Sequence, residues 1–201
     1  MNETSQVISY PKTIVLTGGP GVGKTSIIQR LKEINYPVRK EVFTELFRKA
    51  QDEGRFNEAF LHSRKLIHDL VSAQVDLESQ ATQSEIVFLD RGRIDIWGFA
   101  KNMEIIPDQK DQKKLEDVRY DAIFVVDPMP KKFYDQNAVR RQSYEESLEH
   151  HQALIERYTE FLKFKDLERK VRLFHVPFIE GGSPSSISER TEFILTRVKG
   201  L

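Results

Sequence analysis

Short, continuous runs of apolar residues alternate along the chain with longer segments of helical periodicity. Four runs have the length and character of strands buried on both faces of a parallel sheet. They are Lys12–Thr17, Glu85–Asp90, Tyr120–Asp127 and Val171–Val176. A fifth strand is expected at Pro37–Lys40, although it is poorly apolar, because an alternating α/β chain requires one there. The pattern predicts an α/β three-layer sandwich with a five-stranded parallel sheet and right-handed crossovers.

Helices are predicted between these strands from helical spacing and from capping sequences. Capping boxes at Ser143–Glu146 and Ser186–Glu189 predict the starts of a long helix and of the C-terminal helix. Asn57 is expected to cap a helix that continues to about Gln83. By contrast, Pro107–Lys114 is expected to be a charged surface loop with a short helix after it. Further helices are predicted after Gly23, over Glu41–Ala50 and from Arg91 onward.

Length, charge and composition narrow the class of protein. The 201 residues are typical of one domain, so we expect a single domain over residues 1–201. Lysine and arginine number 31, as do aspartate and glutamate, so no broad attraction to nucleic acid or a membrane surface is expected. The absence of cysteine excludes disulfides and thiolate metal sites. No signal peptide or membrane-spanning run is visible, and we expect a cytoplasmic protein.

The segment after the first strand fits the phosphate-binding pattern G-x-x-x-x-G-K-[ST]. With a strand before it and a helix after it, such a segment turns its backbone N–H groups inward around phosphate oxygens. Lys24 is expected to reach the β- and γ-phosphates of ATP, and the Thr25 hydroxyl to ligate Mg²⁺. The residues expected to bind the nucleotide are Gly18, Gly19, Pro20, Gly21, Val22, Gly23, Lys24, Thr25 and Ser26.

This loop predicts a nucleoside triphosphate but not a reaction, because switches, motors and kinases all use it. A guanine-specific switch has an Asp-x-x-Gly after its third strand and an Asn-Lys-x-Asp later in the chain. Asp95–Gly98 fits the first string, but it lies inside a predicted helix, and the second motif is absent. We therefore interpret the match as coincidence. The chain also leaves little room for the separate helical lid domain of ring-forming ATPases.

The remaining motifs resemble those of the P-loop kinases that act on small metabolites. Leu89–Arg91 looks like the Asp-Arg motif of thymidylate kinases and the Glu-Arg-Ser motif of deoxynucleoside kinases. Val126–Pro128, followed by Arg140 and Arg141, is similar to the approach to their lid. The resemblance implies a kinase-type P-loop nucleoside triphosphate hydrolase fold. It also implies a helical acceptor-side insertion at about residues 41–84 and a lid loop at about 128–142.

A more specific resemblance is to the small AAA-domain ATPases grouped with the ribosylnicotinamide-kinase domain of a bifunctional NAD-biosynthesis regulator. Their pattern joins Thr-Gly-Gly-Pro-Gly-x-Gly-Lys-Thr to an early Glu, an Asp-Arg-Gly and a late Glu-Arg. Glu41, Asp90–Gly92 and Glu189–Arg190 fit these positions. Because the substrates of many proteins in that group are unassigned, the resemblance does not identify the acceptor.

Each candidate catalytic residue also has a purely structural interpretation. Asp90, at the carboxyl end of a strand, is expected to hold Mg²⁺ or orient the acceptor, or else to cap the following helix. Arg91 is expected to bind an acceptor phosphate or the transferring group, or else to form a surface ion pair; Arg93 is a weaker candidate. Glu41 is either the general base toward a hydroxyl acceptor or an acid at a helix start.

Other candidates lie in the predicted lid and on the helices. Arg140 is preferred over Arg141 as the arginine that loop closure delivers to the phosphoryl group; the alternative is solvated loop charge. Aromatic residues at helical spacing are either core residues or a stacking surface for a base: Phe43, Phe47, Trp97 and Phe99. The histidines lack the i,i+4 spacing of paired metal ligands and are expected to be solvated: His62, His68, His150 and His151.

Taken together, the sequence favours an ATP- and Mg²⁺-dependent kinase of a small nucleoside-like or nucleotide-like acceptor. The alternative is a regulatory ATPase or GTPase-type switch that acts through protein partners, and a third is a non-catalytic nucleotide-binding module. Nucleic acid and membrane partners are not expected. The sequence leaves homo-oligomerisation open.

Overall fold

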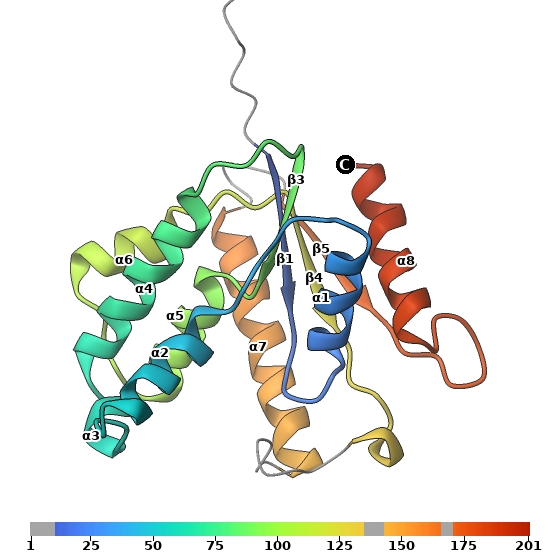
Figure 1. The fold of residues 1–201 in the computed structure, drawn as a ribbon. Coiled ribbons are helices and arrows are strands. Elements are labelled where there is room, and N and C mark those ends of the chain that lie inside the picture. Colours follow the sequence, from blue (N-terminus) through green and yellow to red (C-terminus); the bar gives the residue numbers. More distant parts are fainter. Residues whose placement is uncertain (1–10, 135–142, 166–170) are drawn as a thin grey trace, which may run out of the picture.

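A parallel sheet of five strands forms the centre of the computed structural model, which describes residues 11–134, 143–165 and 171–201 (Figure 1). The spatial order is β2-β3-β1-β4-β5, and every pair of neighbouring strands is parallel. The strands are β1 (Lys12–Thr17), β2 (Val38–Arg39), β3 (Ile86–Asp90), β4 (Ala122–Val126) and β5 (Arg172–Val176). The predicted fold class is confirmed. All carboxyl ends of the strands consequently meet at one edge of the sheet.

Helices cover both faces of this sheet, as Figure 1 shows. On one face lie α1 (Lys24–Glu33) and α8 (Ile187–Lys199), which pack on the sheet and on each other. On the other face lie α5 (Arg93–Asn102) and α7 (Tyr144–Lys165). These layers place the amino ends of α1 and α5 beside the carboxyl edge of β1 and β3.

The central strands are apolar on both faces, which explains their continuous hydrophobic runs. In β1, Ile14 and Leu16 contribute to the core under α1 and α8, whereas Val15 contributes to the core under α5 and α7. In β4, Phe124 and Ile123 are divided between the same two cores. The alternation follows from the two-residue period of a strand.

Four helices beside the sheet, together with α5, enclose a separate apolar core. We call them the helical lobe: α2 (Val42–Asp52), α3 (Glu58–Leu61), α4 (Arg64–Ser79) and α6 (Gln109–Glu116). Three of them, α2 to α4, occupy the predicted acceptor-side insertion. In Figure 1 the lobe lies to the left of the sheet, on the opposite side from α1 and α8.

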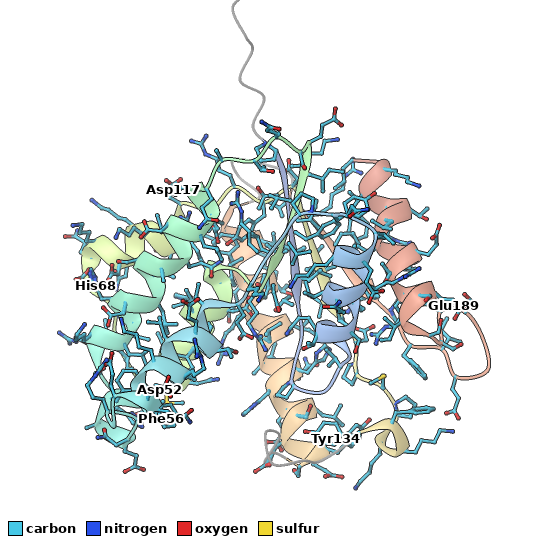
Figure 2. All side chains as sticks on the ribbon, viewed as in Figure 1. Asp52, Phe56, His68, Asp117, Tyr134 and Glu189 are labelled. Carbon is cyan, nitrogen blue, oxygen red and sulfur yellow. The ribbon has the colours of Figure 1, made fainter. Side chains whose placement is uncertain are left out.

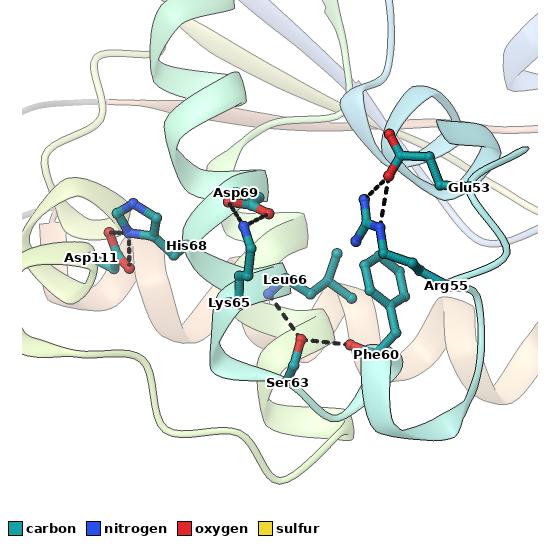
Figure 3. Close-up of polar contacts among 9 residues, drawn as sticks. All are labelled: Glu53, Arg55, Phe60, Ser63, Lys65, Leu66, His68, Asp69 and Asp111. Atoms are coloured by element: carbon teal, nitrogen blue, oxygen red, sulfur yellow. Dashed lines mark hydrogen bonds and ion pairs between the residues drawn. The ribbon is translucent and has the colours of Figure 1, made fainter. Parts of the chain in front are cut away.

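The long helix predicted from Asn57 is interrupted. Asn57 does cap a helix, because its side chain accepts a hydrogen bond from Phe60 N at 2.9 Å, but that helix ends after one turn. Ser63 then starts α4: its hydroxyl accepts from Leu66 N at 3.1 Å and donates to the Phe60 carbonyl at 2.7 Å (Figure 3). A second capping residue inside the predicted helix therefore divides it in two.

The segment predicted as a charged loop also differs. Residues 109–116 form α6, because the Asp108 side chain caps its first turn through a 2.8 Å hydrogen bond from Asp111 N. Both predicted capping boxes are confirmed: Glu146 N donates to Ser143 Oγ at 3.1 Å, and Glu189 N donates to Ser186 Oγ at 3.2 Å. A short 3-10 turn, η1 (Lys131–Phe133), follows β4. The rest of the predicted loop, to Gln142, lies outside the described residues.

Within the described residues, no helix combines the length and the apolar character that a membrane crossing requires.

Candidate functional site

The predicted phosphate-binding loop connects β1 to α1 at the carboxyl edge of the sheet. Gly23, directly before α1, has φ of 87°, a left-handed conformation that favours glycine. Gly21 has φ of 74°, and a Cβ there would lie 2.5 Å from the ring of Tyr134. Tyr134 lies at this same end of the molecule, near the start of α7 (Figure 2). Both glycines are thus required by backbone conformation, and Gly21 also by space.

Arg190 of α8 anchors the phosphate-binding loop through hydrogen bonds to backbone carbonyls. Its side chain is completely buried and donates to the carbonyls of Val22 at 2.8 Å, Asp127 at 2.7 Å and Val176 at 2.9 Å. Burial lowers the pKa of Arg190 to about 10, so the guanidinium is still charged at neutral pH. Arg190 therefore ties the phosphate-binding loop to the ends of β4 and β5.

The N-terminal half of α7 holds the other side of the loop. Ser147 Oγ donates to the Pro20 carbonyl, and Gly19 N donates to His151 Nδ1 at 3.3 Å. The expectation that His151 is solvated is wrong: it is only 6% exposed, because α7 packs directly on the loop. A close approach explains Gly19, since a Cβ there would lie 2.9 Å from that of His151.

Asp127 lies between two histidines at the end of β4. His175 Nδ1 is 2.9 Å and His151 Nε2 is 3.8 Å from Asp127 Oδ1. Burial alone would raise the pKa of Asp127, but the hydrogen bonds with His151 and His175 outweigh it and hold the pKa below its usual value of 3.8. The carboxylate is therefore held ionised next to the loop.

Lys24 and Asp90 form a buried ion pair across the carboxyl edge. Lys24 Nζ lies 3.3 Å from Asp90 Oδ1, and the two side chains are 8% and 13% exposed. Burial, together with the positive charge of Arg91, lowers the pKa of Lys24, while Asp90 acts in the opposite direction. Asp90 does not cap the next helix, because the N-cap of α5 is Gly92. Capping of the following helix, the structural alternative for Asp90, is therefore excluded.

Arg91 is fixed between two carboxylates. Its φ is 70°, and its N–H donates to the Leu16 carbonyl at 3.0 Å. Nε lies 2.8 Å from Glu41 Oε1, and Nη1 lies 3.0 Å from Asp95 Oδ1. Burial acts to lower the pKa of Arg91, but Asp95 and Glu41 outweigh it and raise the pKa. With a side chain only 20% exposed, Arg91 does not form the surface ion pair that was its alternative.

Glu41 occupies the N-cap position of α2, but its side chain makes no capping hydrogen bond. It reaches instead toward Arg91, and its side chain is 23% exposed. The structure thus brings four of the predicted catalytic residues together: Lys24, Asp90, Arg91 and Glu41.

Asp95 is a member of this cluster that sequence reasoning missed. It lies within α5, as expected, and its buried carboxylate accepts from Thr17 Oγ1 at 2.8 Å and Gly92 N at 2.9 Å. Arg91 Nη1 and the Tyr158 hydroxyl donate to the same carboxylate. The signal available in the sequence was an acidic residue in the first turn of the helix after Asp90–Gly92.

Two groups of candidates lie elsewhere. Arg93, the weaker candidate, points away from the loop: Nε lies 2.9 Å from Glu78 Oε2, and Nη1 donates to the carbonyls of Lys114 and Asp117.

The aromatic residues of the stacking interpretation pack in the helical lobe, where Phe43 and Phe47 contact Phe99 edge-on or tilted. These contacts favour the core interpretation. Trp97 also packs against that core.

His68 is exposed, as predicted, but it also has a partner. Its Nδ1 lies 3.0 and 3.2 Å from the two carboxylate oxygens of Asp111, which is buried in the helical lobe (Figure 3). With Asp108 these residues bring three donor atoms within 4.8 Å of one another. Capping of α6 and an ordinary hydrogen bond account for this geometry.

ATP is expected to bind at the loop, and Mg²⁺ at Thr25 and Asp90. Asp90 Oδ1 is buried and faces Lys24 Nζ at 3.3 Å, in an ion pair without hydrogen-bond geometry. A carboxylate oxygen in this position is also of the ligand type that Mg²⁺ prefers. A groove of about 440 Å³ runs along α1 from its first to its last turn and is separate from the Lys24–Asp90 pair; it is lined by Thr25, Ser26, Gln29, Arg30, Glu33 and Ile187. The donor set fits ATP and Mg²⁺. Arg140 and Arg141 lie outside the described residues.

Solved structures with the same fold include nucleotide-binding proteins. The chain matches NadR in complex with NR at TM-score 0.67 and 20% identity, over 96% of this chain and 52% of NadR. It also matches NadR in complex with NAD and AMP-PNP at TM-score 0.61 and 21% identity, over 96% and 50% of the two chains. The chain therefore spans about half the length of NadR.

A third match, at TM-score 0.57 and 20% identity, is deoxyadenosine kinase from M. mycoides with dCMP and dCDP bound; it covers 94% of this chain and all of that one. At these identities the matches show a shared fold. No curated protein sequence matches the chain. A family model described as the AAA domain matches residues 13–168, which is well over half of the sequence, and the chain belongs to this family.

Proposed function

We propose that this protein is an ATP- and Mg²⁺-dependent kinase that transfers the γ-phosphoryl group to a small nucleoside-like or nucleotide-like metabolite. One observation carries the proposal: Lys24 of the phosphate-binding loop lies in a single cluster with Asp90, Arg91 and Glu41. An acid such as Asp90 is common to phosphate-loop NTPases, but a loop that only binds nucleotide does not need a second carboxylate, such as Glu41, at the same edge.

Phosphoryl transfer passes through a loose transition state, so positioning and neutralisation of charge supply most of the catalysis. Lys24 is the cation for the β- and γ-phosphates, and the loop from Gly18 to Ser26 provides the backbone N–H groups. Thr25 and Asp90 are the residues that would hold Mg²⁺. When bound there, Mg²⁺ would supply positive charge that neutralises the negative charge developing in the transition state.

On the acceptor side, Glu41 is the general base for a hydroxyl group. Its partial exposure and its position opposite the loop suit a carboxylate that receives a proton from a bound acceptor. Arg91 holds the Glu41 carboxylate in place at 2.8 Å. Arg140 remains the preferred lid residue, with the role of stabilising charge on the transferring group once the lid closes.

The structural neighbours support a kinase. One is named a deoxyadenosine kinase, and another was solved with AMP-PNP. A kinase of this type acts on a small-molecule acceptor in the cytoplasm and needs neither nucleic acid nor a membrane.

The proposal is tested by ADP formation from ATP with and without a panel of nucleosides, nucleotides and phosphorylated sugars. Acceptor-dependent ADP formation is expected for a narrow group of compounds. Lys24→Ala should abolish it, while Lys101→Ala should not, because Lys101 is exposed, pairs with Glu160 at 3.7 Å and lies over the Trp97 ring, outside the cluster. Hydrolysis that is indifferent to every compound would contradict the kinase and support the regulatory switch.

A further inference from the structure

The arginine that a phosphorylated acceptor would need is already occupied. Arg91 Nε faces Glu41 at 2.8 Å and Nη1 faces Asp95 at 3.0 Å. In an arginine that recognises phosphate, guanidinium N–H groups form parallel bonds to the anion, and either fork of the group uses Nε or Nη1. Here they are directed at carboxylates of the protein itself.

The other arginines of this edge are also engaged. Arg39 of β2 donates from Nη1 to the Glu78 carbonyl at 2.7 Å and from Nη2 to the Gln80 carbonyl. Arg93 pairs with the Glu78 carboxylate and with two backbone carbonyls. At the ends of β2 and β3, every arginine side chain that the structure describes therefore has acceptors within the protein.

The charges of the cluster also disfavour an acceptor that carries a phosphate group. Lys24 and Arg91 are two cations, and they share the cluster with three carboxylates, those of Glu41, Asp90 and Asp95. A phosphate monoester would add about two negative charges beside this surplus, at a buried site where electrostatic interactions are strong. A neutral or cationic compound meets no such repulsion.

Resting on the proposed kinase function, we infer that the acceptor is a hydroxyl compound without a phosphate group, because Asp95 and Glu41 together neutralise Arg91. The acceptor is thus of the nucleoside class, neutral or positively charged. Its transferable hydroxyl loses a proton to Glu41 as the oxygen bonds to the γ-phosphorus, and ADP leaves. An acceptor that was already a phosphate would require no base.

Of the two carboxylates that contact Arg91, those of Glu41 and Asp95, Asp95 determines the specificity. Its side chain is 2% exposed, and its two oxygens accept from Thr17, Gly92, Arg91 and Tyr158. This network connects the strand before the phosphate-binding loop to α5 and α7, so Asp95 cannot move away to release Arg91. Glu41 is more exposed than Asp95, at 23% against 2%, so of the two carboxylates that pair with Arg91 it is the one that a bound acceptor can reach.

The first test compares matched pairs, each a nucleoside and its 5′-monophosphate, as phosphoryl acceptors for the full chain with ATP and Mg²⁺. The unphosphorylated member is expected to have a kcat/KM at least about 100-fold higher, in keeping with like-charge repulsion of several kcal/mol. Asp95→Asn should reduce this preference about 10-fold by weakening the hold on Arg91. A preference for monophosphates would overturn the inference while leaving the kinase proposal intact.

Two further variants, Glu41→Gln and Glu78→Gln, compare a carboxylate inside the cluster with one outside it. Glu41→Gln removes the charge of the exposed partner without disturbing the Asp95 network, and it is expected to improve binding of the monophosphate member. Glu78→Gln is the matched control, because it removes a carboxylate from Arg93 outside the cluster. It should lower stability and leave the acceptor preference unchanged.

A second measurement does not depend on turnover. The Nε–H signal of Arg91, assigned by its loss in Arg91→Lys, is followed by NMR while inorganic phosphate is added to protein filled with a non-hydrolysable ATP analogue and Mg²⁺. No phosphate-dependent shift is expected in the wild-type chain, and a shift is expected in Asp95→Asn. A saturable millimolar shift in the wild-type chain would overturn the inference, whether or not the kinase assay succeeds.

Discussion

The carboxyl edge of the sheet and the helical lobe both carry many charges, but the charges are placed differently. At the edge, Lys24 pairs with Asp90 and Arg91 with Asp95, and all four side chains are at most 20% exposed. In the lobe, Lys65 pairs with Asp69 through an i,i+4 contact in which the lysine is 74% exposed (Figure 3). Buried charges are costly and exposed pairs contribute little to stability. The phosphate-binding loop has a cluster of such buried charges beside it, whereas the lobe combines the exposed pair with single buried groups such as Asp111.

The two regions are also held together by different forces. The loop at the edge is fixed by directional hydrogen bonds: Arg190 and Ser147 donate to its carbonyls, and Gly19 N donates to His151. The lobe is held by apolar contacts, including edge-on and tilted aromatic pairs around Phe47. Substitutions should therefore affect turnover at the edge and mainly stability in the lobe.

The largest expected effect is that of Lys24→Ala on turnover. Loss of a preorganised cation at the phosphates should lower kcat about 10³-fold, equivalent to about 4 kcal/mol in the activation barrier. Steady-state kinetics measures this loss, and circular dichroism establishes that the variant is folded. A loss below about 10-fold would mean that Lys24 does not face the reacting phosphates.

Arg190→Met should have the largest effect on stability. It removes three hydrogen bonds and leaves the carbonyls of Val22, Asp127 and Val176 without their donor, at an expected cost of about 3 kcal/mol. Urea unfolding measures the change. Arg197→Met, on the same helix, is the control, because Arg197 donates to the Phe193 carbonyl one turn earlier and lies over the Phe193 and Phe174 rings, away from the loop. Equal effects of the two substitutions would contradict the anchoring role of Arg190.

Features that depend on neighbours in the chain could be predicted from the sequence. The phosphate-binding loop, the two capping boxes and the continuous apolar strands β1, β3 and β4 each have a signal within a few consecutive residues, although the strands themselves pair with distant parts of the chain. The interruption at Ser63 and the start of α6 at Asp108 are also local, but short polar caps compete with helical periodicity and outweigh it here.

The missed site residues depend on long-range contacts. His151 is 132 positions from Gly19, Asp95 is 78 from Thr17, and Arg190 is 168 from Val22. Nothing in the local pattern distinguishes these side chains from solvated ones, because their burial results from the packing of α5, α7 and α8 on the sheet. The sequence therefore predicts where phosphate binds better than it predicts what holds that site rigid.

Phe47→Ala should destabilise the lobe without affecting the edge. Phe47 contacts Phe43, Phe56, Phe60 and Phe99, but it is only half-buried, so we expect about 2 kcal/mol, below the range for a fully buried phenylalanine. Thermal and urea unfolding measure it. Phe164→Ala, at a side chain that is 61% exposed, is the control. A large fall in kcat with unchanged stability would instead support the stacking interpretation.

Asp127→Asn should change the acid limb of the stability profile. Because hydrogen bonds with His151 and His175 hold the pKa of Asp127 below 3.8, its contribution is fully present above about pH 5 and is lost as the pH falls through and below 3.8. The variant should be less stable than the wild-type chain at pH 6 and converge with it near pH 3. A constant difference across this range would contradict the assignment.

The smallest effect is expected for Lys65→Ala. Its exposed i,i+4 pair with Asp69 should contribute about 0.5 kcal/mol or less, and salt should reduce that further. Urea unfolding at low and high ionic strength measures it. A loss above about 1.5 kcal/mol would mean that the contrast between the edge and the lobe is not a difference in burial.

The central claim is that this edge transfers a phosphoryl group to a small acceptor. The most direct measurement uses ATP carrying heavy oxygen in its γ-phosphoryl group and follows the label by mass spectrometry in the presence of a candidate nucleoside. The account predicts that the label appears in a phosphorylated nucleoside and that Lys24→Ala abolishes this product. Label found only in inorganic phosphate, with every nucleoside tested, would contradict it.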